Sequence, residues 1–74
     1  MTIEWRPVVG SSWVIAEAYS AEEEAIYVRF SDGTGWKYLA CPPSVWTEFT
    51  ADGQSRGKYI NSTLKFKPGG KFVD

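Results

Sequence analysis

The sequence predicts an α+β domain, a three-stranded antiparallel meander covered on one face by two short helices. Three observations lead to this fold class. Segments rich in β-branched and aromatic residues occupy the first half of the chain, polar or glycine-containing turns separate them, and a Pro-Pro pair then precedes apolar residues at helical spacing. Such an order favours a sheet formed by the first half of the chain and helices from the second half that cover it.

The three strands are expected at Trp13–Tyr19, Ala25–Phe30 and Trp36–Ala40. Residues 20–24 form a polar turn between the first two, and residues 31–35, with an Asp-Gly pair, suit a hairpin loop before the third. Side chains alternate between the two faces of a strand. Ile26, Val28 and Phe30 should therefore face the core, while Tyr27 and Arg29 face outward.

Two helices are expected after the sheet. Proline is tolerated at the first position of a helix, so Pro42-Pro43 suits a helix from about Pro43 to Thr50. A second helix runs from about Ser55 to Leu64, with Ile60 and Leu64 on one face. The predicted core consists of Ile26, Val28, Phe30, Val45, Phe49, Ile60 and Leu64.

The 74 residues are expected to form a single domain over 1–74. Residues 1–6 form an N-terminal arm that is read either as an edge strand or as a dimer arm, and residues 67–74 form a tail, either a closing strand or a flexible end. Twelve aromatic residues exceed what so small a core can bury. We therefore expect a homodimer, with Trp5 or Trp13 near the contact.

Composition excludes several function classes. The chain has one cysteine and no histidine, so it has no internal disulfide, and neither a zinc site nor a Ser-His-Asp triad is expected within one chain. We expect no metal, no cofactor and no enzymatic activity. Cys41 in its apolar context is read as a buried structural thiol. No signal peptide or membrane-spanning run is seen, so a cytoplasmic protein without membrane partners is expected.

The strongest functional signal is the stretch from Ser55 to Asn61. A capping serine, a glycine and two cations meet where the second helix begins, and free helix amides favour an anion. Charge supports this placement, because residues 55–74 carry five basic residues against one acidic residue, whereas residues 1–54 carry three against eight. The alternative is that Ser55 only caps the helix and the cations are solvated.

The candidate ligand-binding residues come from three places. The helix start would hold phosphate, the paired serines near residue 11 would add hydroxyl groups, and aromatic rings would stack a base. Ser11 and Ser12 also have a structural reading, in which they satisfy a buried turn. The full set is Ser55, Arg56, Gly57, Lys58, Tyr59, Asn61, Ser11, Ser12, Trp36 and Tyr38.

In order and spacing, the chain resembles the KTSC domain over roughly Arg6 to Phe66. The resemblance rests on the segments RPVVGSS, IYVRF, WKY, PPSVW and SRGKYIN, with Tyr19 and Gly33 between them. Departures are Glu17, where that family usually has an aliphatic residue, Trp46 and Phe49 in place of Tyr and Leu, and the Pro68-Gly69-Gly70 tail. Glu17 puts the packing of the first strand in doubt.

The resemblance implies the fold more than the function. The family takes its name from its position after a lysyl-tRNA synthetase, which suggested RNA binding, and similar stand-alone chains occur in bacteria and phages. We expect a small non-enzymatic module that binds a nucleotide-type or phosphate-bearing ligand, as a phage protein that sequesters a nucleotide signal or inhibits a host protein would do. The alternatives are an RNA-binding accessory domain and a protein-protein interaction module that uses surface aromatics.

Overall fold

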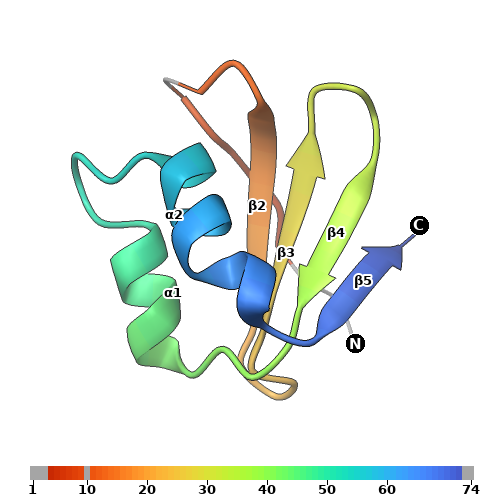
Figure 1. The fold of residues 1–74 in the computed structure, drawn as a ribbon, viewed down its shortest axis with the longest axis vertical. Coiled ribbons are helices and arrows are strands. Elements are labelled where there is room, and N and C mark those ends of the chain that lie inside the picture. The colour runs from red at the N-terminus through yellow and green to blue at the C-terminus, as the bar shows by residue number, and fades with distance from the viewer. Residues whose placement is uncertain (1–3, 10, 73–74) are drawn as a thin grey trace.

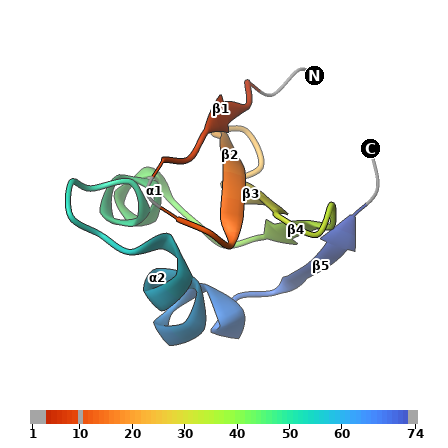
Figure 2. The same cartoon turned by 90° about the horizontal axis from the view of Figure 1, so that it is seen from above.

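The computed structural model describes residues 4–9 and 11–72 and shows a five-stranded antiparallel sheet with its helices on one face (Figures 1 and 2). The strands follow the sequence order β1-β2-β3-β4-β5. The strands are β1 Arg6–Pro7, β2 Val14–Ser20, β3 Ala25–Phe30, β4 Gly35–Tyr38 and β5 Gly69–Phe72. The helices are α1 Pro43–Phe49, α2 Arg56–Ser62 and the 3-10 helix η1 Leu64–Phe66.

The α+β class and the antiparallel sheet are as predicted, but the expected three-stranded meander is only the centre of the sheet. One short strand is added at each edge. Arg6–Pro7 pairs with β2, which favours the edge-strand reading of the N-terminal arm, and Gly69–Phe72 pairs with β4 as a closing strand. The second predicted helix is divided, because α2 ends at Ser62 and a 3-10 turn follows. Residues 1–3 of the arm and 73–74 of the tail lie outside the described residues.

A β-bulge in β2 changes which side chains face the helices. Val14 pairs with Phe30 and Ala16 with Arg29, so Ile15 is the extra residue between them. Regular alternation would put Val14 and Glu17 on opposite faces. The bulge puts both on the helix-covered face, where Glu17 pairs with Val28.

The core lies between the helices and this face of the sheet. It joins strand residues to Phe49 of α1, to Tyr59 and Ile60 of α2, and to Leu64 of η1. Of the predicted core, Ile26, Val28, Phe30, Phe49, Ile60 and Leu64 are buried, and Val45 packs against them half-buried. Cys41 is also buried, as predicted, and its thiol donates to the Leu39 carbonyl oxygen, with 3.3 Å between sulfur and oxygen.

Several of the surplus aromatic rings pack within the chain. Trp5 covers the outer face of the sheet, where its ring meets Tyr27 edge-on at 6.4 Å and the Arg29 guanidinium lies 5.1 Å from its centre. Trp13 stacks on Phe30, with ring centres 4.8 Å apart, and keeps 42% of its surface exposed. These contacts give Trp5 and Trp13 a structural role in the monomer.

Candidate functional site

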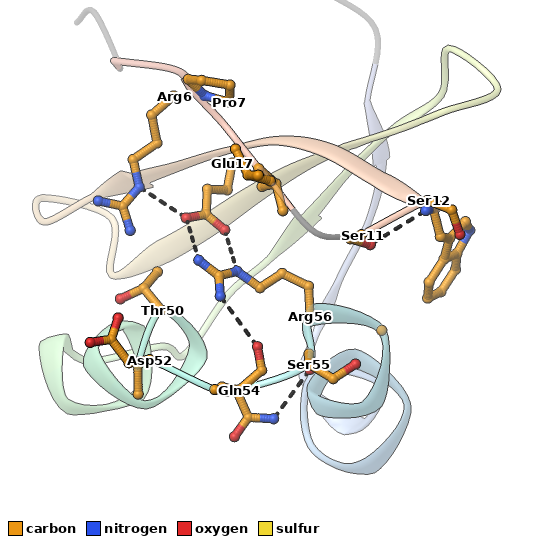
Figure 3. Close-up of a pocket in the computed structure, with 16 residues that line it drawn as sticks. Arg6, Pro7, Ser11, Ser12, Glu17, Thr50, Asp52, Gln54, Ser55 and Arg56 are labelled. Atoms are coloured by element: carbon orange, nitrogen blue, oxygen red, sulfur yellow. Dashed lines mark hydrogen bonds and ion pairs between the residues drawn. The ribbon is translucent and has the colours of Figure 1, made fainter.

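A cleft of about 900 Å³ separates the β1–β2 connection from the α1–α2 loop, residues 50–55 (Figure 3). One wall comes from residues 6–9 and 11–13 and the other from residues 50–57, with Glu17 of β2 between them. This volume lies within the range of about 300–1,000 Å³ found for small-molecule sites. Two segments that are far apart in the sequence therefore line one cleft.

Glu17 is the central charge of the cleft. Its side chain is only 1% exposed, and an isolated buried carboxylate would be strongly unfavourable. Two arginines compensate it. Arg56 Nε donates to Glu17 Oε1 at 2.9 Å and Arg56 Nη2 to Oε2 at 3.1 Å, while Arg6 Nε donates to Oε2 at 2.9 Å. These three residues are called the Arg-Glu-Arg cluster below.

The two arginines of the cluster differ in what they leave free. Arg56 is 19% exposed, and its third nitrogen donates to the Gln54 carbonyl oxygen at 3.3 Å, so its guanidinium is committed to the fold. Arg6 is 53% exposed, with its guanidinium 5.1 Å from the centre of the Trp46 ring. Of the three nitrogens of the Arg6 guanidinium, only Nε has a hydrogen-bond partner among residues 4–9 and 11–72. Both Arg6 Nη groups are therefore available to a ligand.

The α1–α2 loop contributes polar groups from the opposite wall. Ala51 to Gln54 form a turn closed by a hydrogen bond from Gln54 N to the Ala51 carbonyl oxygen at 3.1 Å, and Gly53 supplies the positive φ of 80°. This turn holds the exposed Asp52 at the lip of the cleft, where its side chain and that of Arg6 extend into the same space (Figure 3).

The structure gives the start of α2 a capping geometry. Ser55 is the N-cap, and its Oγ accepts from Lys58 N at 3.4 Å. Gly57 has no positive φ. A Cβ there would lie 3.2 Å from Trp13 Cε3, so the glycine lets the Trp13 ring lie close to the start of α2. Ser55, Arg56 and Gly57 all line the cleft, although Arg56 serves Glu17 first.

The paired serines also reach the cleft. Ser11 Oγ accepts from the amides of Trp13 and Val14 at 3.3 and 3.1 Å, which is the predicted turn-forming role. Ser12 is exposed at the same wall. The structure therefore brings both predicted serine elements, far apart in sequence, into one cleft.

Five predicted ligand-binding residues are not brought into the cleft: Lys58, Tyr59, Asn61, Trp36 and Tyr38. Lys58 and Asn61 are exposed on α2. Tyr59 is buried and donates to Glu48 Oε1 at 2.9 Å, and burial together with this hydrogen bond raises its pKa to about 12. Tyr38 is a core residue, while Trp36 lies more exposed on β4.

Sequence reasoning missed Arg6, Glu17 and Asp52 as site residues. A signal for Glu17 was present, because a single acid in an otherwise apolar strand must find a cation if it faces inward. Pairing it with Arg56 requires knowing that the bulge turns Glu17 inward. Asp52 carried no comparable signal, because an Asp-Gly pair is also an ordinary turn.

Of the described residues that line the cleft, no serine or threonine has a hydroxyl group hydrogen-bonded to a carboxylate. Among the described residues, no group of three His, Cys, Asp or Glu side chains is placed to hold a metal ion. The same part of the chain contains no helix of the length and apolar character that a bilayer crossing requires. The cleft presents the charged side chains of Arg6, Glu17, Asp52 and Arg56 together with serine hydroxyl groups.

Comparisons with known proteins identify the family. The family model described as KTSC domain matches residues 10–67. A protein of Tsukamurella paurometabola is 32% identical over 57 residues, which cover 77% of this chain and 84% of that protein. The crystal structure of a KTSC domain protein from Yersinia pestis shares the fold, with a TM-score of 0.79, 99% of both chains covered and 19% identity. The chain therefore belongs to the KTSC domain family.

Proposed function

We propose that this member of the KTSC domain family is a non-enzymatic binding module whose cleft takes a small nucleotide-type ligand through a phosphate group. The observation that carries the proposal is the state of Arg6. Glu17 and Trp46 fix its guanidinium from two sides, while both Nη groups remain open to the cleft. An arginine fork that is already held in place loses little entropy when it binds a phosphate.

The serines complete the proposed phosphate site. Ser12 and Ser55 line the same cleft and carry hydroxyl groups that donate to phosphate oxygens. Arg56 acts indirectly, because it shares the Glu17 charge and leaves Arg6 with only one carboxylate contact. A module of this kind would suit the sequestration of a nucleotide signal.

Charge argues for a compact ligand over RNA. The cleft contains Arg6, Arg56, Glu17 and Asp52, so its formal charges cancel. RNA binding usually draws on several cations that contact successive phosphates, and it weakens steeply with salt. We expect only a shallow salt dependence, as for a ligand that makes one or two phosphate contacts.

A thermal-shift screen with mononucleotides, cyclic dinucleotides and short RNA tests the proposal, because a ligand specific for the folded state raises the melting temperature. Calorimetry on a compound that binds then compares variants. Arg6→Ala should weaken binding about ten- to a hundredfold, since a hydrogen bond to a charged group contributes roughly 1.5–3 kcal/mol.

Two matched variants make this test specific. Lys71→Ala removes a cation from β5, outside the cleft, and should leave affinity unchanged. Lys58→Ala asks whether the exposed cation on α2 contributes as the sequence predicted. Equal losses in Arg6→Ala and Lys71→Ala would show a general charge effect and reject the site.

Protein-protein interaction is the second candidate function. Val9, Trp13 and Ile15 are 92%, 42% and 44% exposed, and all belong to the β1–β2 region beside the cleft. Exposed apolar groups of this kind suit a partner protein or a second copy of the chain. Sedimentation at high micromolar concentration tests the predicted homodimer, and a mass of about 8.3 kDa there would reject self-association.

A further inference from the structure

The cleft has an acidic side as well as a basic one, and the proposed phosphate site uses only the basic side. Asp52 lines the cleft from the α1–α2 loop, opposite β1, which carries Arg6 (Figure 3). The two side chains do not form an ion pair with each other, so the Asp52 carboxylate and the Arg6 Nη groups are both open to a ligand. The cleft therefore presents a cation on one wall and an anion on the other.

Asp52 differs from the other turn aspartate, Asp32. The Asp32 carboxylate accepts from Thr34 N at 3.0 Å and from Thr34 Oγ1 at 2.6 Å, and these bonds lower its pKa. Asp32 thus stabilises its own turn. The Asp52 turn is closed by backbone atoms and Gly53, and the Asp52 carboxylate has no hydrogen-bond or ion-pair partner within residues 4–9 and 11–72. Unlike the Asp32 carboxylate, the Asp52 carboxylate is therefore not used to hold its own turn.

We infer that Asp52 reads the base of the bound nucleotide and selects guanine. This inference rests on the proposed function. An ionised carboxylate only accepts hydrogen bonds, so the group that faces it must donate. Guanine presents a ring N–H and an amino group side by side, whereas adenine presents an amino group beside ring nitrogens that accept. If the phosphate binds Arg6 and the guanine edge faces Asp52, the two ends of the ligand contact the two charged walls of the cleft.

The neutral total charge of the cleft agrees with a ligand of this mixed character. A second phosphate placed near Asp52 would be repelled, while a donor-rich base is attracted there. A cleft of about 900 Å³ has room for a nucleoside monophosphate. Arg6 and Asp52 together thus determine both the class of ligand and the direction in which it lies in the cleft.

Calorimetry with GMP, AMP and ribose 5-phosphate tests the inference. The wild-type chain should bind GMP about tenfold more tightly than AMP, because a good bidentate contact to a base discriminates by about that factor or more. Asp52→Asn should abolish this preference and leave ribose 5-phosphate binding unchanged. Glu22→Gln, which removes an exposed carboxylate outside the cleft, should preserve the preference.

The contrary outcomes are separable. Ribose 5-phosphate binding with equal affinity for GMP and AMP would overturn the inference and leave the phosphate site standing. So would a GMP preference that survives in Asp52→Asn. If none of the three probes binds, the proposed function fails and the guanine inference fails with it.

Discussion

The two edges of the sheet are attached in different ways. At the β1 edge, only Arg6 and Pro7 pair with β2, and the contact is reinforced by the ion pair between Arg6 and Glu17. At the β5 edge, four residues pair with β4, two of them glycines. A Cβ on Gly69 would lie 1.9 Å from the Lys37 carbonyl oxygen, so this edge depends on close backbone contact.

This difference separates an edge held by the backbone from the edge that carries the proposed binding site. The β5 edge is held by close backbone contacts, and its cation, Lys71, lies outside the cleft. Side-chain contacts at the β1 edge leave the unused face of an arginine exposed to a cleft. Side-chain substitutions at the β1 edge should therefore be tolerated in stability but weaken the proposed ligand binding. At the β5 edge, even a small substitution at the closest backbone contact should lower stability.

The largest expected effect is that of Gly69→Ala at the β5 edge. We expect a loss of about 3 kcal/mol or more, because a sparsely populated φ alone costs about 1–3 kcal/mol and the clash with Lys37 adds to it. Strand β5 should separate from β4. Hydrogen exchange should then show lost protection at the Leu39 amide, which donates to the Pro68 carbonyl oxygen at 2.7 Å.

Gly70→Ala is the matched control, since a Cβ there has nothing within 4 Å and its φ is not positive. It should change stability by less than about 0.5 kcal/mol, as surface substitutions usually do. Equal losses at both glycines would mean that β5 is weakened by side chains in general and not by the close contact.

An intermediate effect is expected for Glu17→Ala at the β1 edge. Removing one partner of a buried ion pair costs about 3–5 kcal/mol, but Arg6 and Arg56 reach solvent through the cleft, so we expect about 1–3 kcal/mol. Denaturant unfolding measures the change.

The double variant Glu17→Leu with Arg56→Leu sharpens the comparison. Apolar residues often replace a buried ion pair without loss, so stability should recover toward wild type. The phosphate binding that we propose for Arg6 should still weaken, because Glu17 no longer holds its guanidinium. Recovery of both properties would show that the Arg-Glu-Arg cluster does not position Arg6.

The smallest expected effect concerns alkaline pH. Burial raises the pKa of Tyr38 to about 12, and Tyr38 pairs with Gly69 across β4 and β5. A raised pKa favours the protonated form in the folded state, so its stabilisation is complete below pH 10 and is lost as pH rises toward 12. The arginines of the β1 edge stay charged over this range.

Melting temperatures between pH 9 and pH 12 test this prediction. Tyr38→Phe should reduce the fall in melting temperature by roughly a few degrees. Tyr27 and Tyr59, whose pKa values are also raised to about 12, should contribute to the rest of the fall, as should Tyr19 and Cys41, whose pKa values are raised by burial. An unchanged fall in Tyr38→Phe would show that Tyr38 ionises without loosening the fold.

The sequence predicted the centre of this molecule better than its edges. Alternation in β3 and helical spacing in α1 identified core residues such as Val28 and Phe49, because those patterns repeat over several residues. Strand β1 has only two residues, and two of the four residues in β5 are glycines, so neither strand shows an alternation of apolar and polar residues. Their positions depend on partners elsewhere in the chain.

The candidate site was predictable only in part, for the same reason. Ser55, Arg56 and the paired serines were named from local signals, and the structure brings them into one cleft. The role of Arg56 toward Glu17 depends on a single bulge residue, Ile15, which local spacing did not reveal.

Cys41 gives the molecule an internal reporter. It is the chain's only cysteine, it is fully buried, and burial is the main cause that raises the pKa of its thiol. A thiol reagent needs both access and a thiolate, so labelling must wait until the core opens. When reclosing is faster than labelling, the labelling rate measures the open fraction of the native ensemble. A ligand that binds only the folded state would lower this open fraction and would then be detected as slower labelling, without an introduced cysteine.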